Sequence, residues 1–76
     1  QETRNVKAAR RREWEKNDAF RAAKQSAEAR LGSTGRLLVR PSGTEPVLRI
    51  TVEAQDSTVA KSTANELAQV AAKELV

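Results

Sequence analysis

Two prolines, Pro41 and Pro46, enclose a short polar segment between two strand-like runs, and no other feature constrains the fold as much. The runs are residues 36–40 and 47–53, which are rich in leucine, valine and isoleucine. Proline has no amide hydrogen to donate to a neighbouring strand, so neither run is expected to continue into the segment between them. The pattern therefore predicts a β-hairpin whose strands are joined by the loop of residues 41–46.

The two faces of this hairpin follow from its register. We expect Arg40 to lie opposite Val47, and successive side chains of a strand point to opposite faces of the sheet. One face is then wholly apolar and is the predicted core face: Leu37, Val39, Leu48, Ile50 and Val52. The other face carries Arg36, Leu38, Arg40, Val47, Arg49, Thr51 and Glu53. In this register Arg40 and Arg49 are diagonal neighbours about 7–8 Å apart, so one oxyanion can touch both.

Helical spacing of apolar residues is found on both sides of the hairpin. Residues 18–31 are predicted to form a helix that begins at Asp18 as its cap and ends at Gly32. Its apolar stripe is Phe20, Ala23, Ala27 and Leu31. A second helix is predicted to begin after a cap at Asp56 or Ser57. Its stripe is Val59, Thr63, Leu67, Val70, Ala71 and Leu75.

The start of the chain is less clearly patterned. Residues 3–8 are a weak candidate strand, because Val6 is its only large apolar residue. Trp14 is expected to pack as a lid over the first helix. The order of elements is then weak strand, helix, strand, loop, strand, helix. This order predicts an α+β domain in which two helices cover one face of a small antiparallel sheet.

Length and composition exclude several classes of protein. A chain of 76 residues forms one small domain with a thin core. The absence of Cys and His excludes a disulfide framework, a Cys/His zinc site, a thiol nucleophile and a histidine base. No apolar run approaches the roughly 20 residues of a membrane span, and no signal peptide is visible. These two features lead us to expect a cytoplasmic protein, and because the chain begins with Gln and contains no Met, we expect a piece of a longer one.

Charge is distributed unevenly along the chain. Residues 1–49 hold twelve Lys and Arg against six Asp and Glu, whereas residues 50–76 hold two against four. Anionic partners are therefore plausible: nucleic acid, a phosphorylated small molecule or an acidic protein surface. The alternative for the run of arginines at 10–12 is an ordinary solvated surface. A nucleic-acid-binding module needs exposed aromatic side chains for stacking, and Trp14 and Phe20 are both expected in the core.

The loop of residues 41–46 has the chemistry of a phosphate cradle. Ser42 and Thr44 carry hydroxyl groups that can donate to an oxyanion, and Gly43 lets backbone amides approach a ligand closely. The guanidinium groups of Arg40 and Arg49 suit phosphate oxygens. Two readings remain open on composition alone, a simple turn-rich hairpin loop and a purely structural domain that holds an oligomer together.

Residues 35–53 resemble the C-terminal signature of the α-D-phosphohexomutase superfamily, and most closely its bacterial phosphoglucosamine mutase family. The resemblance rests on the run Arg-Pro-Ser-Gly-Thr-Glu-Pro-Val-Leu-Arg at 40–49. It implies a TATA-box-binding-protein-like domain 4, with residues 1–76 as a single C-terminal phosphate-binding domain of a four-domain enzyme. The chain departs from the family at its start, where polar residues stand in place of an apolar first strand: Glu2, Thr3 and Arg4. This departure predicts that the first strand is frayed or lies at a sheet edge.

The resemblance also implies roles for individual residues. The family's loop grips the sugar phosphate that is not being transferred, and the matching phosphate-binding positions are Arg40, Ser42, Gly43, Thr44 and Arg49. The residues expected to shape the loop are Pro41, Glu45 and Pro46. None of these residues is implied to be catalytic or to bind metal. Ser42 is not the family's phosphorylated serine, because that serine belongs to another domain.

For the full-length enzyme the resemblance implies interconversion of glucosamine 6-phosphate and glucosamine 1-phosphate, on the way to cell-wall peptidoglycan precursors. The implied cofactors are Mg²⁺, which this domain does not bind, and glucose or glucosamine 1,6-bisphosphate as activator or intermediate. The implied partners are the phosphosugar substrate and the missing domains 1–3, with no nucleic acid and no membrane. The fragment alone is expected to be inactive. A related phosphomannomutase or phosphoglucomutase remains the alternative, because the loop that selects the sugar lies in another domain.

Overall fold

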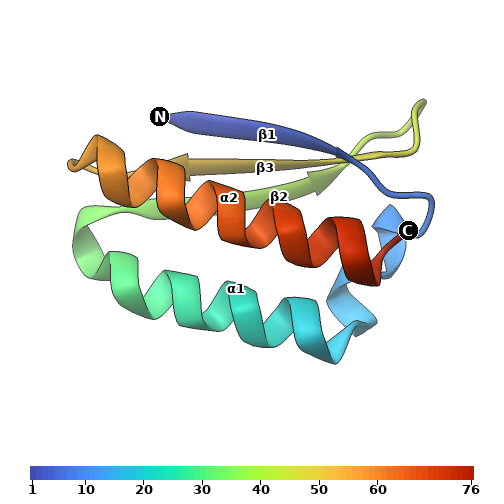
Figure 1. Cartoon of the computed structure of the whole chain (residues 1–76), viewed down its shortest axis with the longest axis horizontal. Helices are drawn as coiled ribbons and strands as arrows, with labels where there is room; N and C mark the ends of the chain where they lie inside the picture. The colour runs from blue at the N-terminus through green and yellow to red at the C-terminus, as the bar shows by residue number, and fades with distance from the viewer.

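The computed structural model describes residues 1–76 as a three-stranded sheet with two helices on one face (Figure 1). In chain order the elements are β1 (Glu2–Lys7), the 3-10 helix η1 (Arg11–Lys16), α1 (Asp18–Leu31), the short 3-10 turn η2 (Gly32–Thr34), β2 (Arg36–Pro41), β3 (Val47–Glu53) and α2 (Ser57–Glu74). The α+β class and the placement of both helices on one face of the sheet are therefore as predicted. No helix of the chain combines the length and the apolar character that a membrane crossing requires.

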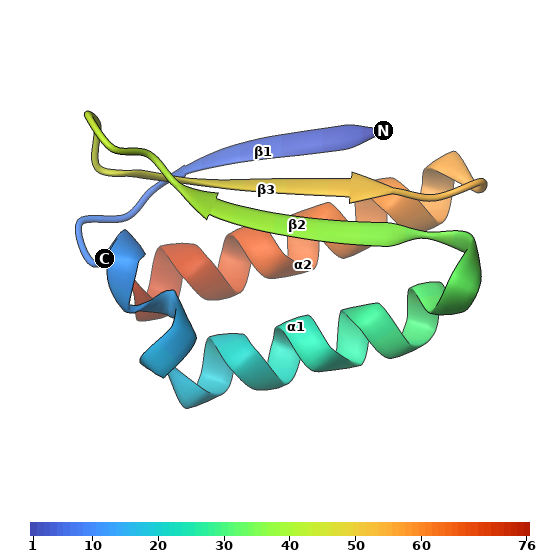
Figure 2. The same cartoon turned by 180° about the vertical axis from the view of Figure 1, so that it is seen from behind.

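The strand order is β1-β3-β2, and both outer strands run antiparallel to β3. The last strand in the chain therefore lies between the first two, as the view from behind shows (Figure 2). The weak strand predicted at the start is real, and it lies at a sheet edge. Its Arg4 is on the helix-covered face, where Nε donates to Oδ1 of Asn65 in α2 at 2.9 Å. A charged residue pointing inward at an edge discourages pairing with further strands.

The predicted hairpin register is wrong by two residues. Arg40 lies opposite Arg49, not Val47, and Pro41 continues β2 by pairing with Leu48. Because Ser42 donates its amide to the Val47 carbonyl at 2.9 Å, the amide position of Pro41 faces the free edge of the sheet, where no N–H is needed. A slip of two residues keeps every side chain on its predicted face.

Polar side chains close the start of each helix. Asn17 caps α1 by accepting a hydrogen bond from the Phe20 amide at 2.8 Å, so the prediction that Asp18 is the cap is wrong. Asp18 is instead the first helical residue, where its negative charge interacts favourably with the positive end of the helix dipole. Asp56 caps α2 and accepts from the amides of Thr58 and Val59, in agreement with one of the two predicted caps.

The core lies between the sheet and the two helices. Leu48, Ile50 and Val52 of β3 are fully buried, and Leu37 and Val39 pack against them. The stripe predicted for α2 is partly wrong, because Val59 is exposed. The buried positions of α2 and its end are Ala60, Thr63, Ala64, Leu67, Ala71 and Leu75. Three of these six residues are alanines, whose small side chains add little bulk between the helix and the sheet.

Two glycines shape the connection from α1 to β2. Gly32 ends the helix with a φ of 59°, a conformation that L side chains rarely adopt. Gly35 has no room for a side chain, because a Cβ there would lie 2.7 Å from the Glu53 carbonyl oxygen. The connection is therefore tight, and it places β2 directly beside β3.

The segment between β1 and α1 forms the helix η1, which the sequence did not predict. Its Trp14 packs against the core and makes an edge-on contact with Phe20, with ring centroids 6.1 Å apart. The predicted lid over α1 is therefore correct.

The two helices are joined by an exposed ion pair between Arg30 and Glu66 at 2.6 Å. The hydrogen bond from Arg30 lowers the pKa of the Glu66 carboxyl.

Candidate functional site

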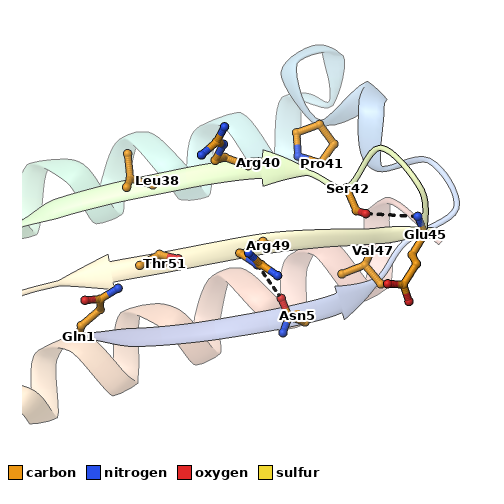
Figure 3. Close-up of a pocket in the computed structure, with 10 residues that line it drawn as sticks. All are labelled: Gln1, Asn5, Leu38, Arg40, Pro41, Ser42, Glu45, Val47, Arg49 and Thr51. Carbon is orange, nitrogen blue, oxygen red and sulfur yellow. Dashed lines mark hydrogen bonds between the residues drawn. The ribbon is translucent and has the colours of Figure 1, made fainter.

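The sheet face that carries no helix holds a shallow hollow of about 640 Å³ (Figure 3). Ten residues of the three strands, the β2–β3 loop and the start of the chain line it: Gln1, Asn5, Leu38, Arg40, Pro41, Ser42, Glu45, Val47, Arg49 and Thr51. Most of these side chains are polar, and two are arginines. The hollow runs along the open face from Gln1 at the start of the chain to Ser42 and Glu45 in the loop (Figure 3). Three of the five predicted phosphate-binding residues line it, namely Arg40, Ser42 and Arg49.

Arg40 and Arg49 come together because β2 and β3 pair at this point. They are direct cross-strand partners, not the diagonal neighbours that the sequence register predicted. Directly opposed side chains have their Cβ atoms about 4.5–5.5 Å apart, so both arginines rise from one place on the open face, with Arg40 directed away from β3 and Arg49 toward Asn5 (Figure 3). Both side chains are exposed, and neither is in a salt bridge. This place on the open face therefore offers uncompensated positive charge to an anion.

Asn5 holds one of these arginines. It lies in β1 opposite Arg49, and its Oδ1 accepts a hydrogen bond from Nε of Arg49 at 3.2 Å (Figure 3). This contact leaves the two terminal nitrogens of the Arg49 guanidinium free for a ligand. Sequence reasoning missed Asn5, because nothing local indicates that β1 pairs with β3. Once the pairing is known, alternation along β1 places Asn5 on the open face.

The loop after β2 is organised around Ser42. Its Oγ accepts from the amides of Thr44 at 3.3 Å and Glu45 at 3.2 Å, so these two amides are already engaged. The expectation that the loop's backbone amides are free for a ligand is therefore too broad. The Ser42 hydroxyl hydrogen remains available, since its oxygen acts only as an acceptor in these contacts.

Gly43 and Thr44 lie in the loop beyond the residues that line the hollow. A Cβ added to Gly43 would meet nothing within 4 Å, and its φ is not in the left-handed region. Neither crowding by the protein nor backbone conformation therefore requires glycine at this position. What the residue provides is open space beside its amide. The side chain of Glu45 lines the loop end of the hollow, where it can accept from a hydroxyl or amine.

The arginines at 10–12 differ in their contacts, although the sequence presents them as one run. Arg10 pairs with Glu13 through two contacts of 3.3 Å, and this hydrogen bonding raises the pKa of Arg10. Arg11 donates from Nε to the Ser42 carbonyl at 2.8 Å, and Arg12 reaches the Gly43 carbonyl at 3.5 Å. Two of the three therefore contact the candidate loop. These carbonyl partners could not be assigned from local sequence, because the loop lies about thirty residues away.

The chain offers no arrangement of side chains suited to a resident metal ion. No group of three or more His, Cys, Asp or Glu side chains lies close enough together to hold one. Both aromatic residues are engaged elsewhere, since Phe20 is fully buried and Trp14 packs against the core. The site is therefore a cationic surface with hydroxyl and amide donors, whose chemistry suits a small oxyanion.

Most of the chain is similar in sequence to a known protein family. The family described as "Phosphoglucomutase/phosphomannomutase, C-terminal domain" matches residues 4–70. A protein of Ralstonia nicotianae named phosphoglucosamine mutase is 47% identical over 64 residues, which cover 84% of this chain and 14% of that protein. Its namesake in Methylobacillus flagellatus is 47% identical over 70 residues, 92% of this chain and 16% of that protein. The one in Frankia alni is 48% identical over 66 residues, 87% and 14% respectively. The chain thus spans only 14–16% of the length of these relatives.

Proposed function

Because this chain belongs to the phosphoglucomutase/phosphomannomutase C-terminal domain family, we propose that it is the phosphate-binding domain of a phosphoglucosamine mutase. In this proposal it grips the phosphate of the bound sugar that is not being transferred. The observation that carries the proposal is the direct pairing of Arg40 with Arg49 beside Ser42, on a sheet face left open. The names of the similar proteins favour glucosamine phosphate as the substrate class. A related mutase acting on mannose or glucose phosphates is the alternative.

The chemistry of the site fits this role. Two guanidinium groups can each give two parallel hydrogen bonds to phosphate oxygens, and charge-assisted bonds of this kind are stronger than neutral ones. The Ser42 hydroxyl adds a further donor, and Glu45 is placed to accept from a sugar hydroxyl or amine. A phosphate dianion would neutralise both arginines at once. Binding energy from a phosphate that does not react can position the one that does.

The rest of the reaction is assigned to parts of the enzyme outside these 76 residues. Phosphoryl transfer is expected to use a phosphoserine, Mg²⁺ and a bisphosphorylated sugar. The residues of this chain do not fit a metal ion, so no step of the transfer is placed here. Ser42 serves the proposed site as a donor and as the organiser of its loop.

A titration tests the proposal on the chain as it stands, since the chain carries its own buried core. Amide shifts are followed by NMR at fixed salt while glucosamine 6-phosphate is added, with glucosamine as the control ligand. We expect shifts confined to residues 40–45 and Arg49, absent with glucosamine. Affinity for a single phosphate should be on the order of millimolar, because few contacts offset the cost of association.

Substitution of Arg40 sharpens this test. Arg40→Ala should weaken binding about tenfold or more, because it removes a hydrogen-bonding charge from the site. Arg36→Ala is the matched control, since Arg36 lies on the same strand and face but outside the hollow. Equal weakening by both variants, or shifts spread over residues 10–12, would point to nonspecific attraction of polyanions instead.

A further inference from the structure

The loop between β2 and β3 is hydrogen-bonded to the segment that follows β1. The Nε of Arg11 donates to the Ser42 carbonyl at 2.8 Å, and the Arg11 side chain is half-buried. The Ala8 amide donates to the Pro46 carbonyl at 2.7 Å, and Arg12 makes a longer contact of 3.5 Å to the Gly43 carbonyl. Carbonyl groups at both ends of the loop are therefore held in place by a separate part of the chain.

The geometry of the peptide bond transmits this contact to the other side of the loop. In a trans peptide the carbonyl and the following amide point in opposite directions, and the chain has no cis peptide bond. Because the Ser42 carbonyl points toward Arg11, the Gly43 amide points away from η1. This amide makes no hydrogen bond within the loop, unlike the next two amides, which donate to the Ser42 oxygen.

Open space lies beside the same amide. A Cβ at Gly43 would have no atom within 4 Å, so an oxyanion has room to approach the backbone there. Ser42, whose peptide unit Arg11 holds, also lines the hollow that contains Arg40 and Arg49. A free amide, a free hydroxyl hydrogen and two guanidinium groups thus lie around one end of the sheet.

We propose that Arg11 is a positioning residue of the phosphate site: by holding the Ser42 carbonyl, it orients the Gly43 amide for the phosphate that Arg40 and Arg49 bind. This inference rests on the proposed function. Arg11 would act by raising the fraction of molecules whose loop is in the binding conformation. The apparent dissociation constant equals the intrinsic one divided by this fraction. Arginine suits the task, since its planar guanidinium keeps its charge at all physiological pH values and loses little freedom per bond formed.

The test compares variants of the 76-residue chain titrated with inorganic phosphate and followed by NMR. Arg11→Ala should raise the dissociation constant about tenfold, as expected for the loss of a charge-assisted hydrogen bond. The Gly43 amide resonance, which should shift on phosphate binding in the wild type, should shift much less at the same phosphate concentration. The thermal midpoint should change little, because Arg11 adds nothing to the buried core. Arg11→Lys keeps the charge and should restore part of the affinity.

Arg21→Ala is the matched control for charge. Arg21 is exposed on α1, its side chain makes no hydrogen bond, and it lines no part of the hollow. Its removal should leave both the affinity and the Gly43 shift as in the wild type. Equal weakening by Arg11→Ala and Arg21→Ala would overturn the positioning role in favour of a general effect of net charge.

The outcome also separates this inference from the function on which it rests. If Arg40→Ala weakens phosphate binding while Arg11→Ala does not, the phosphate site stands and the role of Arg11 is wrong. If neither variant changes the affinity, both the site and its positioning residue are wrong. Weaker binding in both variants, with a reduced Gly43 shift in Arg11→Ala and affinity partly recovered in Arg11→Lys, supports both.

Discussion

Arg40 and Arg49 face each other across two strands although they carry the same charge. Like charges directly opposite in a sheet destabilise it, and here no carboxylate forms a salt bridge with either residue. Solvent exposure keeps this cost small, since water screens exposed charges. An oxyanion between the two guanidinium groups would turn the repulsion into attraction. Their placement is thus better explained by an anionic ligand than by stability of the sheet.

Asn5 provides a test of this explanation at the level of one side chain. Asn5→Ala removes the acceptor that orients Arg49 through Nε, but leaves the charge of Arg49 in place. We expect about threefold weaker phosphate binding, less than for Arg40→Ala, because orientation is lost while attraction remains. Phosphate titration of the chain measures this difference.

The control for Asn5 lies two residues away on the same strand and face. Thr3→Ala removes a hydroxyl that is hydrogen-bonded across the strands to Thr51 at 3.3 Å, but touches neither arginine. Its phosphate affinity should match the wild type. An Asn5→Ala affinity no weaker than that of Thr3→Ala would contradict the role assigned to Asn5.

At the scale of whole elements, β3 is the strand on which the fold depends. It is paired on both sides and contributes three fully buried side chains to the core. Ile50→Ala should lower the free energy of unfolding by about 2–5 kcal/mol, since a buried side chain is lost and a cavity is left behind. Leu38→Ala is the control on β2, because Leu38 is 43% exposed on the opposite face whereas Ile50 is fully buried. Urea unfolding followed by circular dichroism measures both, and a loss near zero for Ile50→Ala would contradict its place in the core.

How far the sequence predicts these elements depends on how local each signal is. The helix α1, the strand β3 and the capping of α2 by Asp56 follow from nearby residues, and the sequence predicts them correctly. The faces of the hairpin were also predicted correctly despite the wrong register, because a slip of two residues preserves alternation. The register itself depends on Pro41 pairing at the sheet edge, which the rule that proline ends a strand does not anticipate.

Contacts between segments far apart in the chain could not be predicted from the sequence. The pairing of β1 with β3 joins residues forty to fifty positions apart, and it alone brings Asn5 to Arg49. The helix η1 has no apolar stripe that indicates it, and its Arg11 meets Ser42 only in the folded chain. For this reason local sequence could nominate the loop residues of the candidate site, whereas it could not indicate their distant contacts with Asn5 and Arg11.

At the scale of the whole molecule, the two faces of the sheet have separate tasks. One face and the helices form the core, while the other face and the loop carry the arginines and hydroxyls of the candidate site. Substitutions in the candidate site should therefore change phosphate binding with little effect on folding. The same separation leaves the open face accessible to a ligand and, in the proposed function, to the other domains of the enzyme. The chain spans 14–16% of the length of the relatives it matches.

This division of tasks leads to a prediction about activity. The chain alone, given glucosamine 6-phosphate, Mg²⁺ and glucose 1,6-bisphosphate, should form no glucosamine 1-phosphate, because a grip on the distal phosphate supplies no transfer step. Fused in place of the matching C-terminal segment of the Methylobacillus flagellatus relative, it should restore turnover above that of the truncated relative.

The Arg40→Ala version of this chimera should lose about tenfold or more in kcat/KM, since binding energy of the non-reacting phosphate contributes to the transition state. The chimera carrying Arg36→Ala controls for charge, and a coupled assay of glucosamine 1-phosphate measures all of these proteins. A folded chimera no more active than the truncated relative would contradict the mutase assignment, whereas equal activity of its two arginine variants would contradict the phosphate site alone.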